Sequence, residues 1–142
     1  MTRLRIGAFI LVSAAAVAQA ASADAWVVIV HPKSTFSHLE RKFVADVFFR
    51  RTTQWPDDTP IRPVDASPDS AVRARFSQDI LARSVASMRS YWQQRIFSGQ
   101  GVPPPELRDD VAVVDYVVSH PGAIGYVSRA TSLNGAKAVD VD

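Results

Sequence analysis

The stretch VDASPDSAVRARF, residues 64–76, combines helix-capping residues with a nearby cation. Ser67 and Ser70 place hydroxyl groups where a helix exposes backbone N–H groups, and Arg73 follows one turn later. Such a helix start can bind a small anion, because its N–H groups and partial positive charge attract one. The same residues also form an ordinary cap, with Ser67 at the cap position and a proline after it. The residues alone favour capping, because Asp69 would repel an incoming anion.

No pattern along the chain has the spacing of a known catalytic or metal-binding motif. Walker loops, dinucleotide fingerprints, HExxH and GxSxG are all missing from the sequence. The histidines lie in or beside expected turns and helix starts, without a partner at ligand spacing. These histidines are His31, His38 and His120. We therefore expect a protein that is not an enzyme and that needs no metal and no cofactor.

The first 25 of the 142 residues have the pattern of a secretory signal peptide. Arg3 and Arg5 precede an apolar run over residues 6–17, and small residues follow, with cleavage expected before Trp26. The chain has no cysteine, which excludes disulfides, thiolate metal sites and a lipid anchor on cysteine. These features predict a signal peptide over residues 1–25 and a periplasmic protein that is not lipidated.

Residues 26–142 have the length of one ordinary domain, and we expect a single α/β domain there. Hydrophobic residues make up 47% of the chain, as in globular proteins. The 16 basic and 14 acidic residues give a formal net charge of +2. This near balance gives no reason to expect nucleic acid as a partner.

Strands and helices are expected to alternate in the first half of this domain. The β-branched run at residues 26–30 predicts a buried strand. Ser37 and Glu40 match a capping box and predict an amphipathic helix over residues 38–49. The run at residues 61–64 contains a proline and predicts a short edge strand.

Three further helices are predicted from caps and apolar spacing. One begins at Ser67, the next at Ser84 with its end at Gly99, and the last at Asp109 or Asp110. Residues at three- or four-residue spacing are expected to face the core on these helices. They are Val72, Phe76 and Ile80; Met88, Trp92 and Ile96; and Val111, Val114 and Val118.

Two short strands complete the expected fold, at residues 123–127 and 138–142. Trp55 precedes a proline in a turn, and we expect it to fold back as a lid on the core. Helical spacing also predicts core positions for five aromatic residues: Phe43, Phe48, Phe76, Trp92 and Phe97. The alternation of elements predicts an α/β fold, in which a small mixed β-sheet is flanked by helices.

Several segments occur in an order that resembles the type 2 periplasmic binding protein superfamily. They are HPKSTF from His31, the turn around Trp55, SAVRARF from Ser70, YWQQRIFSG from Tyr91, and PGAIGYV from Pro121. The resemblance is to the phosphate-binding branch, the solute receptors of ABC phosphate importers. It covers nearly all of residues 26–142. Because such receptors have two lobes, the resemblance implies a fold like one lobe.

The resemblance also implies where a ligand would bind. The family pattern at this helix start is Arg-x-x-x-Ser-Gly-Thr, and here Ala66 replaces the arginine and Val72 the threonine, while Ser70 is kept. Arg73 or Arg62 would have to stand in for the missing guanidinium. The expected ligand residues are Ser67, Ser70, Ala71 and Arg73.

Two functions remain open from the sequence. The first is an exported, phosphate-binding-protein-like domain that takes phosphate or another small oxyanion at a degenerate site. The alternative is a periplasmic interaction or sensory accessory module without a small-molecule ligand. Its partner would be a membrane transporter, a membrane sensor or a second copy of the chain.

Overall fold

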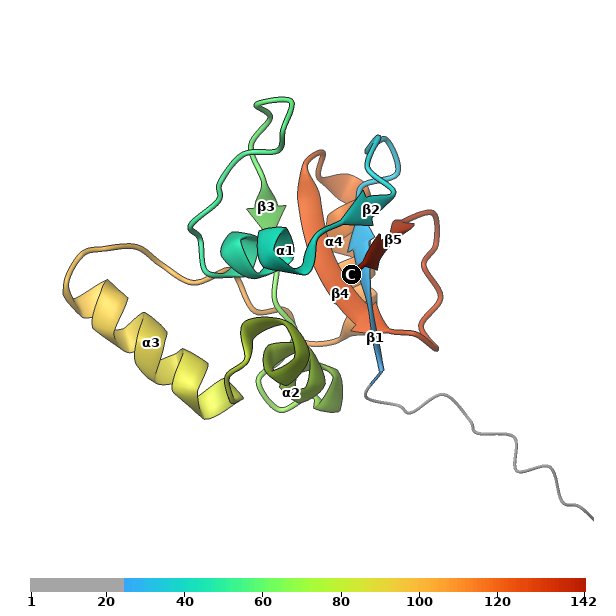
Figure 1. The fold of residues 1–142 in the computed structure, drawn as a ribbon. Coiled ribbons are helices and arrows are strands. Elements are labelled where there is room, and N and C mark those ends of the chain that lie inside the picture. The colour runs from blue at the N-terminus through green and yellow to red at the C-terminus, as the bar shows by residue number, and fades with distance from the viewer. Residues whose placement is uncertain (1–24) are drawn as a thin grey trace, which may run out of the picture.

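A computed structural model describes residues 25–142, so the predicted signal peptide lies outside the described residues except for its last position. The described chain forms a five-stranded mixed sheet in the order β2-β5-β1-β4-β3, with helices packed on both faces (Figure 1). This architecture confirms the predicted α/β class. The elements are β1 (Trp26–Val30), β2 (His38–Leu39), α1 (Arg41–Phe48), β3 (Arg62–Pro63), α2 (Ala71–Phe76), η1 (Ser77–Leu81), α3 (Val85–Phe97), α4 (Asp110–Ser119), β4 (Ala123–Ser128) and β5 (Lys137–Val141).

The strand β1 forms the centre of the sheet because all its residues are β-branched or aromatic. It pairs antiparallel with β4 and with β5, and Val28 lies opposite both Tyr126 and Val139. The short strands β2 and β3 run parallel to β5 and β4 at the two edges. The predicted edge position of β3 is therefore confirmed, and Pro63 sits where no neighbouring strand needs its N–H.

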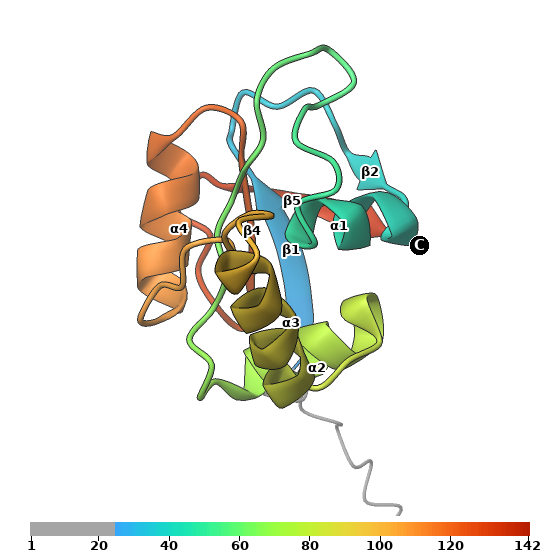
Figure 2. The same ribbon diagram turned by 90° about the vertical axis from the view of Figure 1, so that its left-hand side faces the viewer.

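Helices cover the two faces of this sheet unequally. Val28 and Val30 face a core shared with α1, α2, η1 and α3, whereas Ile29 faces a smaller core against α4 (Figure 2). This alternation follows from the two-residue period of a strand. The sheet is therefore buried on both sides around β1, with the larger core on the side of α1 and α2.

Aromatic rings fill the centre of the larger core. Phe76 of α2 stacks on Tyr126 of β4, with ring centroids 3.7 Å apart and ring planes 7° apart. Phe48 of α1 packs edge-on against both rings, at 5.0 and 5.6 Å. These contacts join α1, α2 and the sheet through apolar surface and ring-edge attraction.

The lid position predicted for Trp55 is confirmed. Its side chain is buried, Phe36 stacks on it with centroids 5.1 Å apart, and its Nε1–H donates to the carbonyl of Gly122 at 3.0 Å. The turn that carries Trp55 is thereby fastened to the segment that leads into β4.

The capping box predicted at Ser37 and Glu40 is wrong. The helix α1 begins at Arg41, and the Glu40 side chain makes no capping hydrogen bond. His38 and Leu39 instead pair with β5, and the N–H of Arg41 donates to the carbonyl of Asp142 at 2.8 Å. Sheet pairing thus satisfies backbone groups that the predicted first turn of helix would have used.

The caps predicted for α3 and α4 are confirmed, but three of the residues predicted to be buried on these helices are exposed. Ser84 and Asp109 cap these helices, and Gly99 follows the end of α3. Ile96 and Phe97 are 52% and 95% exposed, because the end of α3 projects away from the sheet (Figure 1). On α4 the predicted core residue Val111 is exposed, and the buried face consists of Val113, Val114 and Val117.

Within residues 25–142, none of the helices combines the length and the apolar character that crossing a bilayer requires.

Gly125 permits the close packing of α4 on β4. A Cβ atom at this position would lie 2.8 Å from Cγ1 of Val113 and 3.1 Å from Cγ2 of Val64. We predict that Gly125→Ala lowers the free energy of unfolding in urea by about 1–3 kcal/mol, the usual cost of overpacking. Val113→Ala should relieve the clash, so the double variant should lose less than the sum of the two single losses. Additive losses would contradict this packing.

Candidate functional site

The start of α2 differs from the predicted cap by three residues. The N–H of Ser70 donates to the carbonyl of Ser67 at 3.0 Å, and Ser67 Oγ accepts weakly from the N–H of Asp69 at 3.4 Å. These bonds make a turn, so Ser67 does not cap the helix. Ser70 Oγ caps it instead, by accepting from the N–H of Arg73 at 2.9 Å. The hydroxyl of Ser70 is thus engaged in capping, while the N–H of Ala71 takes no part in the cap.

Arg73 leans back toward the chain that precedes α2 and is buried there. Its Nη1 donates to the carbonyl of Ala66 at 2.7 Å and to Oε2 of Glu106 at 3.2 Å. Its Nε lies 3.3 Å from Oδ1 of Asp65. The guanidinium therefore lies beside Ala66, the position where the family pattern has its arginine.

Asp65 is the most deeply buried carboxylate of this site. It accepts hydrogen bonds from the hydroxyl of Tyr126 and from the N–H of Ala66 at 3.0 Å. Burial raises its pKa from the ordinary 3.8 to about 6, although the Arg73 charge and these hydrogen bonds act in the opposite direction. Burial, followed by the Asp65 charge, raises the pKa of Tyr126 well above 10, so its hydroxyl remains a donor.

A cavity of about 180 Å³ opens beside Arg73, between the start of α2, the helix α3 and the proline-rich loop. Arg73 and Arg89 bring two positive charges to its wall, and Asp65 and Glu106 bring two carboxylates. The volume is below that of sites for drug-sized ligands, so it suits a small ion. When Asp65 is ionised, the formal charge of this wall sums to zero.

The guanidinium of Arg73 retains unused donors despite its burial. Among the described residues, neither its Nε nor its Nη2 makes a hydrogen bond, since the contact to Asp65 lacks hydrogen-bond geometry. A buried donor without an acceptor is costly. Nε is fully buried beside the Asp65 carboxylate, so the donor left for a ligand oxygen in the adjoining cavity is Nη2.

Of the four predicted ligand residues, only Arg73 lines this cavity. Ser70 and Ala71 lie at the adjacent helix start, and Ser67 lies in the turn before it. Arg62 lines a separate cavity. The sequence reasoning did not include the other charged lining residues, Arg89 and Glu106, and no local pattern marks either as part of a site.

Residues 25–142 contain no group of three or more His, Asp or Glu side chains placed to hold a metal ion.

The family model described as "PBP superfamily domain", for periplasmic binding proteins, matches residues 13–141. The chain belongs to the PBP superfamily. The resemblance noted from the sequence is thus confirmed, and the fold is that of one lobe of such a protein. The comparison with curated proteins gave no match.

Solved PBP structures share this fold. One is described as a phosphate ABC transporter substrate-binding protein with bound phosphate, from Clostridium perfringens (TM-score 0.66, 20% identity, 82% of this chain and 44% of that chain). A second is an ABC-type phosphate transport receptor from Vibrio cholerae (0.65, 15%, 82% and 45%). A third is PstS from Borrelia burgdorferi (0.64, 14%, 83% and 47%). The chain spans less than half the length of each of these proteins, and the first two are described by a role in phosphate transport.

The raised pKa of Asp65 predicts a specific pH dependence of stability. Because its folded pKa of about 6 exceeds its ordinary 3.8, the folded state binds more protons between these values, and stability falls as pH rises through that window. We expect Asp65→Asn to remove a slope of about 1 kcal/mol per pH unit from urea unfolding near pH 5. The exposed Asp115→Asn should keep the wild-type slope. Parallel profiles for wild type and Asp65→Asn would contradict the assignment.

Proposed function

We propose that this chain is an exported, phosphate-binding-protein-like domain that takes a small oxyanion, weakly, in the cavity beside α2. The ligand-binding unit is a single domain over residues 26–142, delivered by a signal peptide over residues 1–25. The observation that carries the proposal is the buried guanidinium of Arg73, which reaches Ala66, lines the cavity and, among the described residues, makes no hydrogen bond through Nη2. The hydroxyls of Ser67 and Ser70 and the N–H of Ala71 provide the nearby helix start.

In this proposal the carboxylates that already contact Arg73 limit its affinity for an oxyanion. Asp65 and Glu106 already neutralise Arg73, so an oxyanion must compete with both. Like charges at close range repel strongly in a partly buried site. Protonation of Asp65 removes one competing charge, and its pKa of about 6 makes this possible under mildly acidic conditions. Binding should therefore be weak at neutral pH and stronger below pH 6.

Titration calorimetry with sulfate tests this competition, because the charge of sulfate is constant over the pH range used. We expect wild-type dissociation constants of about 1 mM or weaker at pH 7, and tighter binding at pH 5. Glu106→Gln should strengthen binding by about tenfold or more at pH 7, since it removes a carboxylate from the cavity wall.

Glu40→Gln is the matched control, because Glu40 is exposed and its side chain makes no capping bond. It should bind sulfate like the wild type. Arg73→Gln should lose binding, and phosphate should follow the same order of variants. Equal sulfate affinity in the wild type, Glu106→Gln and folded Arg73→Gln would overturn the site.

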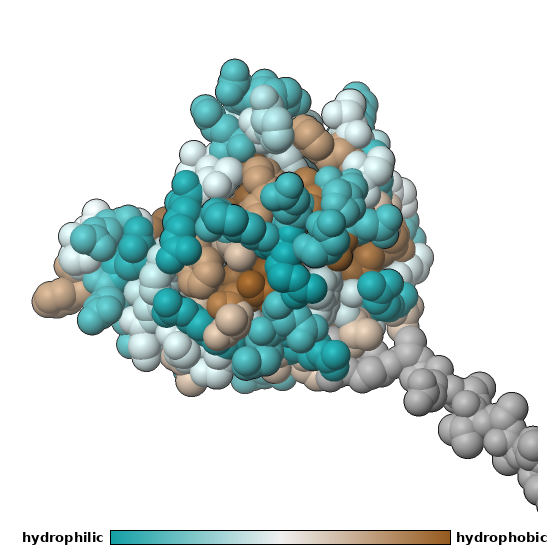
Figure 3. Space-filling model, in the orientation of Figure 1, coloured by the Kyte–Doolittle hydropathy of each residue, from teal (hydrophilic) through white to brown (hydrophobic). Residues whose placement is uncertain are grey.

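An interaction module is the second candidate function, favoured by the exposed end of α3. Ile96, Phe97 and nearby Val102 are 52%, 95% and 59% exposed, and the tip of α3 forms the projecting left edge of the space-filling view (Figure 3). A large side chain such as Phe97 gains free energy when a partner covers it. The partner would be a membrane transporter, a membrane sensor or a second copy of the chain.

Self-association is the form of this second function that is simplest to measure. If two copies meet through α3, sedimentation velocity should show a dimer that Phe97→Ser weakens by about tenfold, because burial of an aromatic ring is lost. Val111→Ser, on the exposed side of α4, is the matched control and should leave the association unchanged. A strictly monomeric wild type would exclude the homodimer.

A further inference from the structure

A second cavity, of about 360 Å³, lies at the end of the sheet where β1 ends and β4 begins. Its wall comes from three loops that are distant in sequence, residues 31–36, 55–60 and 121–123, together with Arg62. In Figure 1 these loops project from the opposite end of the molecule to α2. None of the residues that line the cavity beside α2 belongs to this wall.

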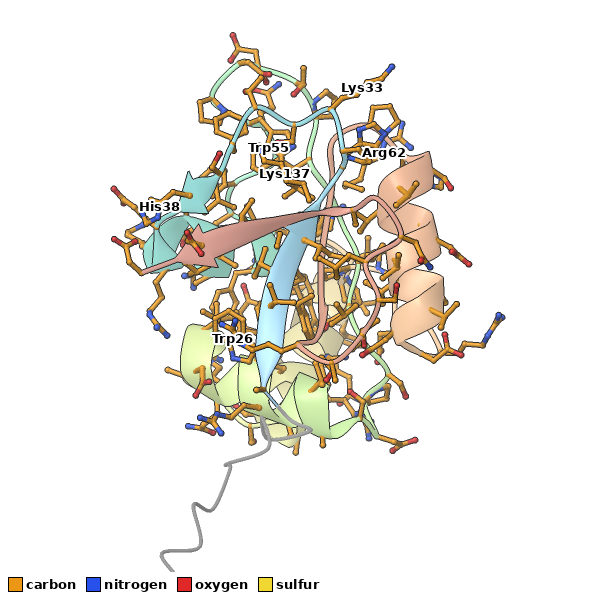
Figure 4. The ribbon with its side chains drawn as sticks, turned by 90° about the vertical axis from the view of Figure 1, so that its right-hand side faces the viewer. Trp26, Lys33, His38, Trp55, Arg62 and Lys137 are labelled. Atoms are coloured by element: carbon orange, nitrogen blue, oxygen red, sulfur yellow. The ribbon has the colours of Figure 1, made fainter. Side chains whose placement is uncertain are left out.

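Positive charge predominates on the wall of this second cavity. Lys33 and Arg62 lie at the same end of the molecule (Figure 4), and among the described residues neither side chain forms an ion pair or hydrogen bond. Lys137 donates to the carbonyl of Ser34 at 3.0 Å and so holds the first loop from outside the wall. The wall therefore carries two cations that form no ion pair with any carboxylate of the described chain.

Asp57 is the only carboxylate on the described wall, and it is engaged within its own turn. Its Oδ1 accepts from the N–H of Thr59 at 3.1 Å and from the Thr59 hydroxyl at 2.6 Å. These hydrogen bonds lower the pKa of Asp57, so it stays ionised and faces its turn. It does not pair with Lys33 or Arg62.

His31 adds a ring donor to the same wall. It is only 9% exposed, and its Nδ1 accepts from the N–H of Lys33 at 3.1 Å. This bond assigns the proton of the neutral ring to Nε2. Among the described residues Nε2 has no hydrogen-bond partner, and it is not one of the fully buried side-chain atoms. A ligand acceptor in the cavity would supply that partner.

The apolar part of the wall is held in place. Phe36 stacks on Trp55, and Trp55 is tied to Gly122 by its indole N–H. Gly122 has φ of 84°, and a Cβ there would lie 2.4 Å from the carbonyl oxygen of Pro60, so only glycine fits. The cavity thus combines a preformed apolar side with a cluster of donors, the usual composition of a small-molecule site.

We propose that this cavity binds a small organic anion, with a carboxylate or phosphate-ester head group and a flat apolar body. Lys33, Arg62 and His31 bind the head group, and the body lies along Phe36 and the neighbouring prolines. The volume is within the range of small-molecule sites and exceeds what a bare oxyanion fills. This site is independent of the oxyanion site beside α2.

Amide chemical-shift mapping of the ¹⁵N-labelled protein locates the site directly. The probes are phenyl phosphate and benzoate. Phenol tests the apolar body without the anionic head group, and inorganic phosphate tests the head group without the body. We expect an organic anion to shift amides of residues 31–36, 59–62 and 122–123, and to bind more tightly than phenol or phosphate. A response only to phenyl phosphate assigns a phosphate-ester head group, and a response only to benzoate assigns a carboxylate. Shifts confined to residues 65–73, or no saturable shift up to about 10 mM of either probe, would overturn the proposal.

Charge and histidine variants test the assigned contacts. The double variant Lys33→Ala, Arg62→Ala should weaken binding by about tenfold, the scale of two exposed ion pairs. Its control is Arg108→Ala, Arg129→Ala, which removes two exposed cations from other surfaces. His31→Asn keeps an acceptor for the N–H of Lys33 but loses the Nε2 donor, so it should weaken binding while the fold persists. Equal affinity in both double variants would also overturn the proposal.

Discussion

The stacked pair of Phe76 and Tyr126 is the contact on which most of this structure depends. It fixes α2 on β4 in the middle of the larger core. The Tyr126 hydroxyl lies at the edge of this ring stack and donates a hydrogen bond to Asp65. Asp65 in turn lies against Arg73 of α2. A single side chain thus joins the apolar packing of the domain to the charged groups of the candidate oxyanion site. The position of that site is therefore determined by the core.

Charge neutralisation is the constraint that follows from this arrangement. A buried guanidinium needs compensating charge, because an isolated buried ion is very costly. In this chain Asp65 and Glu106 supply it from within. The same two carboxylates that stabilise Arg73 also oppose an incoming anion. In our proposal, the carboxylates that neutralise Arg73 therefore compete directly with the ligand for the guanidinium.

The two cavities differ in the charge balance and the exposure of the cations that line them. Beside α2 the charges are balanced and partly buried, whereas at the other end Lys33 and Arg62 stand exposed next to a preformed apolar wall. The chain shares its fold with larger proteins, of which it covers 44% and 45%. It spans only part of what those proteins contain, so its own cavities are the appropriate basis for a functional proposal.

The sequence by itself determined those elements that depend on residues close together in the chain. The β-branched run of β1, the caps at Ser84 and Asp109, and the order of segments that marks the family could all be predicted from the sequence. Tertiary structure decided the rest. Pairing with β5 replaced the capping box at Ser37, and the projection of α3 exposed Phe97. One partner of Arg73 is Glu106, 33 residues further along the chain. Only folding brings together two charges that are so distant in sequence.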